Sequence, residues 1–284
     1  MTTIRRAALL SVLAVAWLAG SMPLLSGQER AAVASPALTP AQMDDFLLHA
    51  RIDKTKDSAK GVTSTQRATL SDGRITHDVS IQTVDISMPL FQPANGPLET
   101  NFKDSYRYNI AGYRLARLLG LDNVPMSVER RVQGKPAAVT WWIDDVLMDE
   151  GERVKKQTTG EVSSRMAGQI HIMRVFDELI ANVDRNGGNI LWTKDGEMWL
   201  IDHTRAFRLN NKLRTPRLLE RCERGLFEKM RGLTAEILNR ETGKSLSKYE
   251  ITALLARRDE LVKLFEGMIA QRGEAAILYT QAKL

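Results

Sequence analysis

The sequence predicts an α+β protein in which a small β-rich N-terminal lobe precedes a mainly helical C-terminal lobe. Short alternating runs fill the first half, where "TQRATLSDGRITHDVSIQTVDISM" turns at Asp72-Gly73 and indicates two or three strands. From about Asp149 onward the apolar residues recur at helical spacing. We therefore expect residues 43–145 to form the N-lobe and residues 146–284 the C-lobe.

Residues 1–27 differ in composition from the rest of the chain. Arg5 and Arg6 precede an uncharged apolar run, which is the layout of a signal peptide and is long enough for a signal anchor. The sequence does not choose between cleavage after Ala16, cleavage after Gly27 and retention as an anchor. The two arginines favour an N-terminus held inside. We expect an extracytoplasmic protein, periplasmic or secreted, that meets a membrane only through an uncleaved anchor.

The remaining composition is that of a folded domain. Hydrophobic residues make up 43% and charged residues 26% of the chain, and the net charge of +6 is scattered among acids. No basic stripe is interleaved with aromatic residues, so we expect no nucleic-acid partner. Residues 28–42 are rich in Ala, Ser and Pro and predict a linker, after which "FLLHARI" is expected to open the strands.

Three further segments have clear patterns. The stretch "KDSYRYNIAGYRLARLLGL" predicts a helix that Asp104 or Ser105 caps and Gly120 closes. The stretch "PMSVERRVQGKPAAVTWWID" predicts a hairpin that turns at Gln133-Gly134. The C-terminal half begins with a helix in "SSRMAGQIHIMRVFDELIANV" and continues with mostly helical patterns.

The segment "NVDRNGGNILWTKDGEMWLID" combines a polar loop with a hairpin. Asp195-Gly196 predicts a two-residue turn with positive φ at both positions. That turn pairs Asn189 with Asp202 across the open end of the hairpin, with Cβ atoms about 5 Å apart. Two oxygen ligands at this separation suit one Mg²⁺ whose other ligands are phosphates and water.

Asp184 lies in the loop before this hairpin, which Gly187 and Gly188 loosen. Phosphoryl transfer requires a carboxylate that orients the attacking hydroxyl and metal ligands for the triphosphate. A polar turn without chemistry is the alternative for any one of these residues. Three of them in one arrangement favour the functional interpretation.

The stretches "DRNGGNIL" and "LIDHTRAF" resemble the catalytic and metal-binding segments of atypical members of the protein-kinase superfamily. The closest in style are the phosphatidylinositol 3/4-kinase-like, HipA-like and secretory-pathway kinases. The resemblance implies a bilobal protein-kinase-like fold with ATP or another nucleotide as phosphoryl donor. It implies Asp184 as the catalytic base, and Asn189 and Asp202 as ligands of Mg²⁺ or Mn²⁺.

Three neighbouring residues are candidates for supporting roles. Arg185 follows the catalytic Asp, as in those families. His203 follows the metal Asp, where His203-Thr204 replaces the Phe-Gly of conventional kinases, and could orient it. Arg205 could pair with a carboxylate or with a substrate phosphate, and the sequence does not decide between them.

The N-lobe departs from the kinase pattern. A kinase needs a glycine-containing loop over the phosphates and a strand lysine steadied by a helix glutamate. Here both charged positions carry amides, which we interpret as an amide–amide pair with the same geometry. A loop lysine could replace the missing cation or be solvated, and the segment "TWWIDD" could be a hinge that packs a base or simply core. The candidates for nucleotide binding are Lys60, Gly61, Gln82, Asn109, Trp142 and Ile143.

Three functions remain open from the sequence. The first is an exported kinase-like phosphotransferase that acts on an unidentified hydroxyl of a protein, lipid, sugar or small molecule, with nucleotidyl transfer as a variant. The second is a pseudokinase that binds nucleotide or metal as a scaffold. The third is an exported interaction protein without catalysis.

Overall fold

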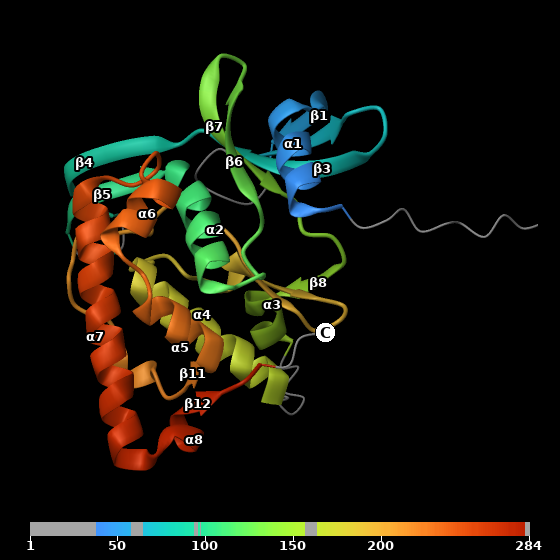
Figure 1. Ribbon diagram of the computed structural model, residues 1–284. Helices are drawn as coiled ribbons and strands as arrows, with labels where there is room; N and C mark the ends of the chain where they lie inside the picture. Colours follow the sequence, from blue (N-terminus) through green and yellow to red (C-terminus); the bar gives the residue numbers. More distant parts are fainter. Residues whose placement is uncertain (1–37, 58–64, 94–95, 97, 157–163, 282–284) are drawn as a thin grey trace, which may run out of the picture. The chain divides into compact units, whose positions relative to one another are not determined.

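A five-stranded antiparallel sheet forms the N-terminal part of the described chain, in the order β1-β2-β3-β7-β6 (Figure 1). The computed structural model describes residues 38–57, 65–93, 96, 98–156 and 164–281. The expected signal segment and most of the expected linker lie outside these residues. The strands of this sheet are β1 (Arg51–Asp57), β2 (Gln66–Ser71), β3 (Thr76–Gln82), β6 (Ser127–Val132) and β7 (Lys135–Trp141).

Helix α1 (Pro40–His49) packs against this sheet and corrects two expectations. The helix begins within the expected linker, and "FLLH" is helical rather than the start of a strand. Thr39 and Gln42 form a capping box, which supports a helix start at Pro40. Phe46 and Leu47 are buried in the core of the sheet, and each contributes about 1.5–3 kcal/mol. The capping box and this burial thus favour a helix over the strand that the short alternating pattern in "FLLHARI" predicts.

A second hairpin and a helix connect β3 to β6. Strands β4 (Asp85–Phe91) and β5 (Glu99–Ser105) form a separate two-stranded sheet, and α2 (Arg107–Leu119) follows. Of the two expected caps, Ser105 accepts from the amide of Arg107 at 3.4 Å, whereas Tyr106, the residue directly before the helix, makes no side-chain cap bond. Gly120 ends the helix in the left-handed conformation, with φ of 73°, as expected.

The C-terminal part is mainly helical, as the sequence predicts, and holds a three-stranded sheet in the order β10-β9-β8. None of the helices in the described residues is both long and apolar enough to span a membrane. The elements from β8 onward are β8 (Val146–Asp149), α3 (Glu150–Lys155), α4 (Ser164–Ile180), η1 (Gly187–Asn189), β9 (Ile190–Thr193), β10 (Met198–Leu200), η2 (Pro216–Leu218), β11 (Cys222–Glu223), α5 (Arg224–Arg231), α6 (Ala235–Thr242), α7 (Lys248–Arg272), α8 (Glu274–Ile277) and β12 (Leu278–Tyr279).

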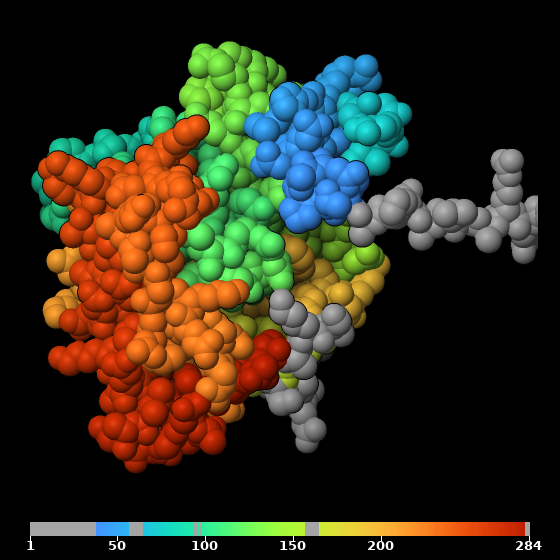
Figure 2. Space-filling view, in the orientation of Figure 1, coloured from blue at the N-terminus to red at the C-terminus, as the bar shows by residue number. Residues whose placement is uncertain are grey.

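Helix α2 belongs to both halves of the core. Leu115 and Ala116 pack in the large cluster formed with α4, α5 and α7, whereas Tyr113 also contacts the cluster under the five-stranded sheet. In the space-filling view a strip of α2 (green) is exposed between α1 (blue) and α6 (orange) (Figure 2). The helix therefore ties the sheet to the helical part.

A buried arginine in α7 supports the chain on both sides of the candidate site. Arg257 is fully buried and donates to the backbone carbonyls of Leu179 at 2.9 Å, Arg208 at 2.8 Å and Asn210 at 2.5 Å. Burial lowers the pKa of this guanidinium to about 10, so it still carries its proton at neutral pH. It joins the end of α4 to the segment that follows β10.

We expect Arg257→Met to lower the free energy of unfolding by about 3 kcal/mol, because three buried carbonyls lose a charged donor. Chemical denaturation followed by circular dichroism measures the change. Lys263→Met on the exposed side of the same helix is the matched control and should change stability by less than about 0.5 kcal/mol. Equal effects of the two substitutions would contradict this role.

Candidate active site

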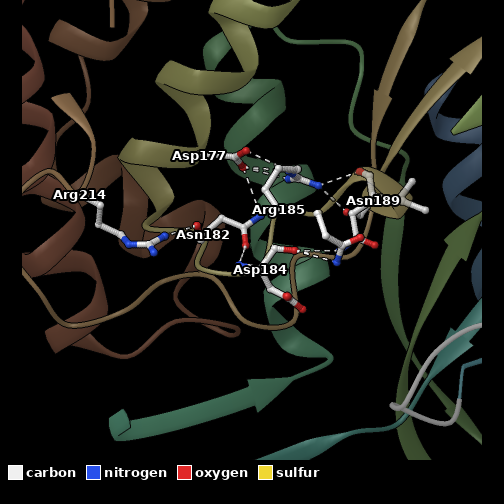
Figure 3. A network of polar contacts seen from close by, with 8 residues as sticks. Asp177, Asn182, Asp184, Arg185, Asn189 and Arg214 are labelled. Atoms are coloured by element: carbon white, nitrogen blue, oxygen red, sulfur yellow. Dashed lines mark hydrogen bonds and ion pairs between the residues drawn. The ribbon is translucent and has the colours of Figure 1, made fainter. Parts of the chain in front are cut away.

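The loop between α4 and β9 is held by one arginine (Figure 3). Arg185 pairs with Asp177 of α4 through a forked contact, with N–O distances of 2.9 and 3.0 Å. Its guanidinium also donates to the carbonyls of Asn189 at 2.9 Å and Ile201 at 2.7 Å. A planar guanidinium can serve all of these acceptors at once, which an ammonium cannot. Arg185 thereby fixes the loop against both strands of the hairpin.

Asp184 is positioned through its backbone, and its side chain is left exposed to the site. Its amide donates to the side chain of Asn182 at 3.1 Å, and its carbonyl accepts from the side chain of Asn189 at 3.0 Å. In Figure 3 the Asp184 carboxylate points away from the Asp177–Arg185 pair. A carboxylate held in this way can accept a proton or orient a hydroxyl.

The hairpin exists, but its predicted register is wrong by one residue. Trp199 pairs with Leu191, and Thr193 and Glu197 close a loop of three residues rather than two. Only Gly196 has positive φ in that loop, as in a type I turn followed by a bulge. Asn189 consequently bonds to Ile201, whose amide donates to its carbonyl at 3.1 Å, and Asp202 lies one residue beyond.

A left-handed backbone at Asp202 changes the direction of the chain directly after the hairpin. Its φ is 53°, which costs a non-glycine residue about 1–2 kcal/mol. Thr204 donates its hydroxyl to the Asp202 carboxylate at 3.0 Å and so supports the bend. Strain of this kind gathers at functional sites.

Asn189 and Asp202 have the chemistry of ligands for a hard divalent cation. The Asn189 nitrogen is used in the bond to Asp184, so the amide oxygen is the atom that can coordinate. The described residues include no group of three or more His, Cys, Asp and Glu side chains arranged around one metal position. A cation held here would take its remaining ligands from water and phosphate, which Mg²⁺ accepts readily.

Gln82 and Asn109 do form the expected amide–amide contact, and the structure extends it in both directions. Asn109 donates to the side-chain oxygen of Gln82, and Gln82 donates to Thr65 at 3.1 Å. The Asn109 oxygen accepts from the backbone amide of His203 at 2.7 Å. Both amide side chains are 5% exposed. This neutral relay connects the strand after the expected phosphate loop to the residue next to Asp202.

His203 is a packing residue whose ring does not reach Asp202 in any recorded hydrogen bond. Its side chain is buried and meets Phe176 edge to face, with ring centroids 5.9 Å apart. A Cβ at Gly112 would lie 3.2 Å from the imidazole, so glycine allows α2 to approach it closely. Burial, and then the charge of Arg185, hold the pKa of this imidazole well below its ordinary value. The ring is therefore neutral.

Arg205 pairs with a carboxylate, which is one of its two expected roles, and its bond to a substrate phosphate stays a prediction. Glu99 of β5 binds Arg205 at 2.5 Å and Arg208 at 2.9 Å. Both guanidiniums lie over the ring of Phe102, at 5.0 and 5.4 Å from its centroid. Two arginines share one glutamate, which leaves one positive charge in excess beside the site.

Asp104 is a residue of the site that the sequence analysis missed as a functional group. It lies on β5, its side chain is 7% exposed, and one carboxylate oxygen is buried without a hydrogen-bond partner. Burial raises the pKa of this carboxyl, Thr204 opposes the rise, and the charge of Asp202 adds to it. The signal in the sequence was only a polar residue at an inward position of a strand.

The chain between β7 and β8 occupies the place expected for a hinge. The amide of Trp142 donates to the carbonyl of Asp78 at 3.1 Å, and the Arg67 guanidinium lies 4.3 Å from the indole centroid. Ile143 is 9% exposed. These contacts place both hinge candidates against the protein, and their role toward a base stays a prediction. Lys60 and Gly61 lie outside the described residues.

Comparisons with known proteins bear on the fold. No protein-family model matches the chain. Protein Rv2133c of Mycobacterium tuberculosis is 51% identical over 43 residues, a match that spans 15% of this chain and 16% of that relative. Among solved structures, hydra Fam20 with a sugar superposes with a TM-score of 0.62 and 14% identity, and covers 86% of this chain and 93% of its own.

The Golgi casein kinase superposes with a TM-score of 0.59 and 13% identity, over 87% of this chain and 80% of that one. These two structures thus share the sheet-rich N-terminal region and the helical C-terminal part described above. The α+β fold class that the sequence predicts is confirmed. The chain has the kinase-like fold of these two structures.

Proposed function

We propose that this protein is a metal-dependent phosphotransferase that transfers a phosphoryl group from ATP or another nucleotide to a hydroxyl acceptor. The observation that carries the proposal is the arrangement around Arg185, which holds Asp184, Asn189 and the strand before Asp202 in one rigid unit. Phosphoryl transfer depends mostly on positioning and on charge stabilisation. A fixed base beside two metal ligands supplies both requirements.

In this mechanism Asp184 accepts a hydrogen bond from the acceptor hydroxyl and takes its proton as the oxygen attacks the terminal phosphorus. The bond between that phosphorus and the bridging oxygen breaks, and the shortened nucleotide, ADP in the case of ATP, leaves. The amide oxygen of Asn189 and the carboxylate of Asp202 would hold Mg²⁺ or Mn²⁺ against the nucleotide phosphates. The metal would neutralise negative charge that develops during transfer. Arg185 keeps the base and the ligands at fixed separations. The left-handed backbone at Asp202 bends the chain directly after the hairpin, and the Thr204 hydroxyl holds its carboxylate.

The acceptor is proposed only as a hydroxyl compound. Protein, lipid, sugar and small-molecule hydroxyls all fit an Asp base beside a metal. The hydra Fam20 structure contains a sugar, so saccharides belong in the first set of acceptors to screen.

We expect Asp184→Asn and Asp202→Asn each to lower phosphoryl transfer by about 10³-fold, because one removes the base and the other a metal ligand. Transfer from radiolabelled ATP to water and to an acceptor panel measures the rate. Asp202→Asn should also weaken metal-dependent nucleotide binding, whereas Asp184→Asn should leave it within about threefold.

The matched control is Asp195→Asn in the exposed turn of the same hairpin, which should retain full activity. Transfer that persists in both site variants while all proteins remain folded would overturn the assignment.

A second candidate function is nucleotide or metal binding without transfer. The specific observation in its favour is the Gln82–Asn109 relay, which is buried and places no cation on β3. A missing phosphate-binding cation removes several kcal/mol of charge stabilisation in a dry site. Metal-dependent nucleotide binding that is lost in Asp202→Asn, with no transfer to any acceptor, would identify this function.

The relay itself can be converted to the charged kinase pair. In Gln82→Lys/Asn109→Glu the lysine can donate to the glutamate, and the glutamate can still accept from the amide of His203, so the connections of the relay survive. We expect this double variant to bind Mg²⁺–ATP more tightly than the wild type, by about tenfold.

Asn109→Leu is the opposite test, because it leaves the His203 amide and the Gln82 oxygen buried without partners. It should lower the free energy of unfolding by about 3 kcal/mol and weaken nucleotide binding. Calorimetric titration and denaturation measure the two effects. A double variant with weaker nucleotide affinity than the wild type would contradict the relay geometry.

We also propose that the protein acts outside the cytoplasm. The support is the arginine-led apolar segment of residues 1–27. Residues 1–42 fused to a reporter that is active only outside the cytoplasm should give activity, and replacing Leu13 and Val15 by Asp should abolish it. Equal reporter activity in both fusions would refute the proposal.

A further inference from the structure

The buried carboxylate of Asp104 is the feature that the proposed mechanism does not use. Its side chain is more than nine-tenths buried, and its Oδ1 has no hydrogen-bond partner. An unpaired buried carboxylate destabilises a fold, since it loses its hydration without compensation. A purely structural role would therefore be better served by an uncharged residue.

The position of Asp104 is fixed toward the metal ligands. The next residue on β5, Ser105, donates its backbone amide to the carbonyl of Thr204 at 2.9 Å. The Thr204 hydroxyl bonds to the Asp202 carboxylate at 3.0 Å and also interacts with the Asp104 carboxylate. One hydroxyl with one proton lies between two carboxylates, so it can donate to only one of them at a time.

The charges around this hydroxyl do not balance. Asp177 is matched by Arg185, and Glu99 is outnumbered by its two arginine partners, which leaves one positive charge. The other carboxylates of the site, Asp104, Asp184 and Asp202, form no ion pair with an arginine in the described residues. With every carboxylate ionised, the site carries two negative charges in excess, which one divalent cation would neutralise.

We propose that Asp104 is an additional metal ligand, and that Asp104 and Asp202 together hold one divalent cation before nucleotide binds. This inference rests on the proposed function and deepens it. The cation would satisfy the buried oxygen of Asp104 and cancel the repulsion between the two carboxylates. Since no group of three His, Cys, Asp or Glu side chains surrounds a common position in the described residues, water and the Asn189 amide complete the coordination.

The second carboxylate also accounts for the neutral relay. In a conventional kinase pair the lysine is matched by the helix glutamate. Here Asp104 brings a carboxylate to the site from a different element, so the N-terminal part contributes through a metal instead of a lysine. The β4–β5 hairpin is the element that carries this ligand to Thr204.

The test measures Mn²⁺ binding to the full chain without nucleotide. Bound Mn²⁺ is detected as a decrease of the free Mn²⁺ signal in electron paramagnetic resonance. We expect Asp104→Asn and Asp202→Asn each to weaken Mn²⁺ binding by about tenfold or more. Asp85→Asn on the same hairpin is the matched control, because Asp85 is exposed and bonds only to Ser105 and Arg107 in the recorded contacts. It should bind Mn²⁺ within twofold of the wild type.

Thermal unfolding separates a ligand from a structural residue. Without metal, Asp104→Asn should raise the melting temperature, because it removes a buried unpaired charge. With saturating Mn²⁺ the wild type should gain more stability than this variant. A lower melting temperature of Asp104→Asn without metal would instead indicate a structural role and overturn the inference.

Two further outcomes would overturn the assignment of Asp104 as a metal ligand and leave the proposed function unaffected. Asp104→Asn could bind Mn²⁺ within twofold of the wild type while Asp202→Asn loses binding. The wild type could also bind no Mn²⁺ until nucleotide is added. In both cases metal-dependent transfer, which is measured with nucleotide present, would remain as proposed.

Discussion

The contact on which the site depends most is the forked pair between Arg185 and Asp177. It joins the last turns of α4 to the loop that carries Asp184, and the same guanidinium reaches the carbonyls at the start of β9 and after β10. Charge-assisted bonds to several acceptors are stronger and more directional than neutral ones. Arg257 of α7 also joins two segments, since it donates to the carbonyl of Leu179 at the end of α4 and to the carbonyl of Arg208 after Phe207. The loop that carries Asp184 and the chain after β10 are thus held by two guanidiniums.

The connection across to the N-terminal part is made without charge. Asn109 of α2 accepts from the amide of His203, and Ser105 of β5 donates to the carbonyl of Thr204. These two bonds fix His203 and Thr204, the two residues directly after Asp202. A neutral connection positions the metal ligand but supplies no cation for phosphate. This division explains why the charge pattern of the proposed site differs from that of a conventional kinase, and why the proposed mechanism relies on a metal.

Much of this site follows from local patterns that the sequence displays. Asp184, Asn189 and Asp202 lie within one short segment. The Asp-Gly turn indicates the β9–β10 hairpin, and the Gln-Gly turn indicates the β6–β7 hairpin. The pairing of Gln82 with Asn109 could be expected because both stand where a charged pair belongs. The register of the β9–β10 hairpin could not, since a two-residue and a three-residue turn share the Asp-Gly signal and differ in the backbone angles of the residues before Gly196. That difference moves Asp202 out of the ladder.

Long-range packing accounts for the other misses. Asp104 is an unremarkable strand residue until β5 meets the segment after β10, a contact between residues about a hundred positions apart that no local pattern reports. The same holds for Glu99, which becomes the partner of Arg205 only through this approach. In α1 the capping box was visible in the sequence, but the alternation in "FLLHARI" concealed it. Where tertiary contacts decide, periodicity alone misleads.

The central claim is that a divalent cation and a nucleotide meet between Asn189 and Asp202 beside Asp184. A crystal structure of the protein grown with Mn²⁺ and a non-hydrolysable ATP analogue tests it most directly, because the anomalous signal of manganese locates the metal. The account predicts an anomalous peak within coordination distance of Asp202, with the terminal phosphate facing the Asp184 carboxylate. A nucleotide bound elsewhere, or a metal that contacts none of these residues, would contradict it.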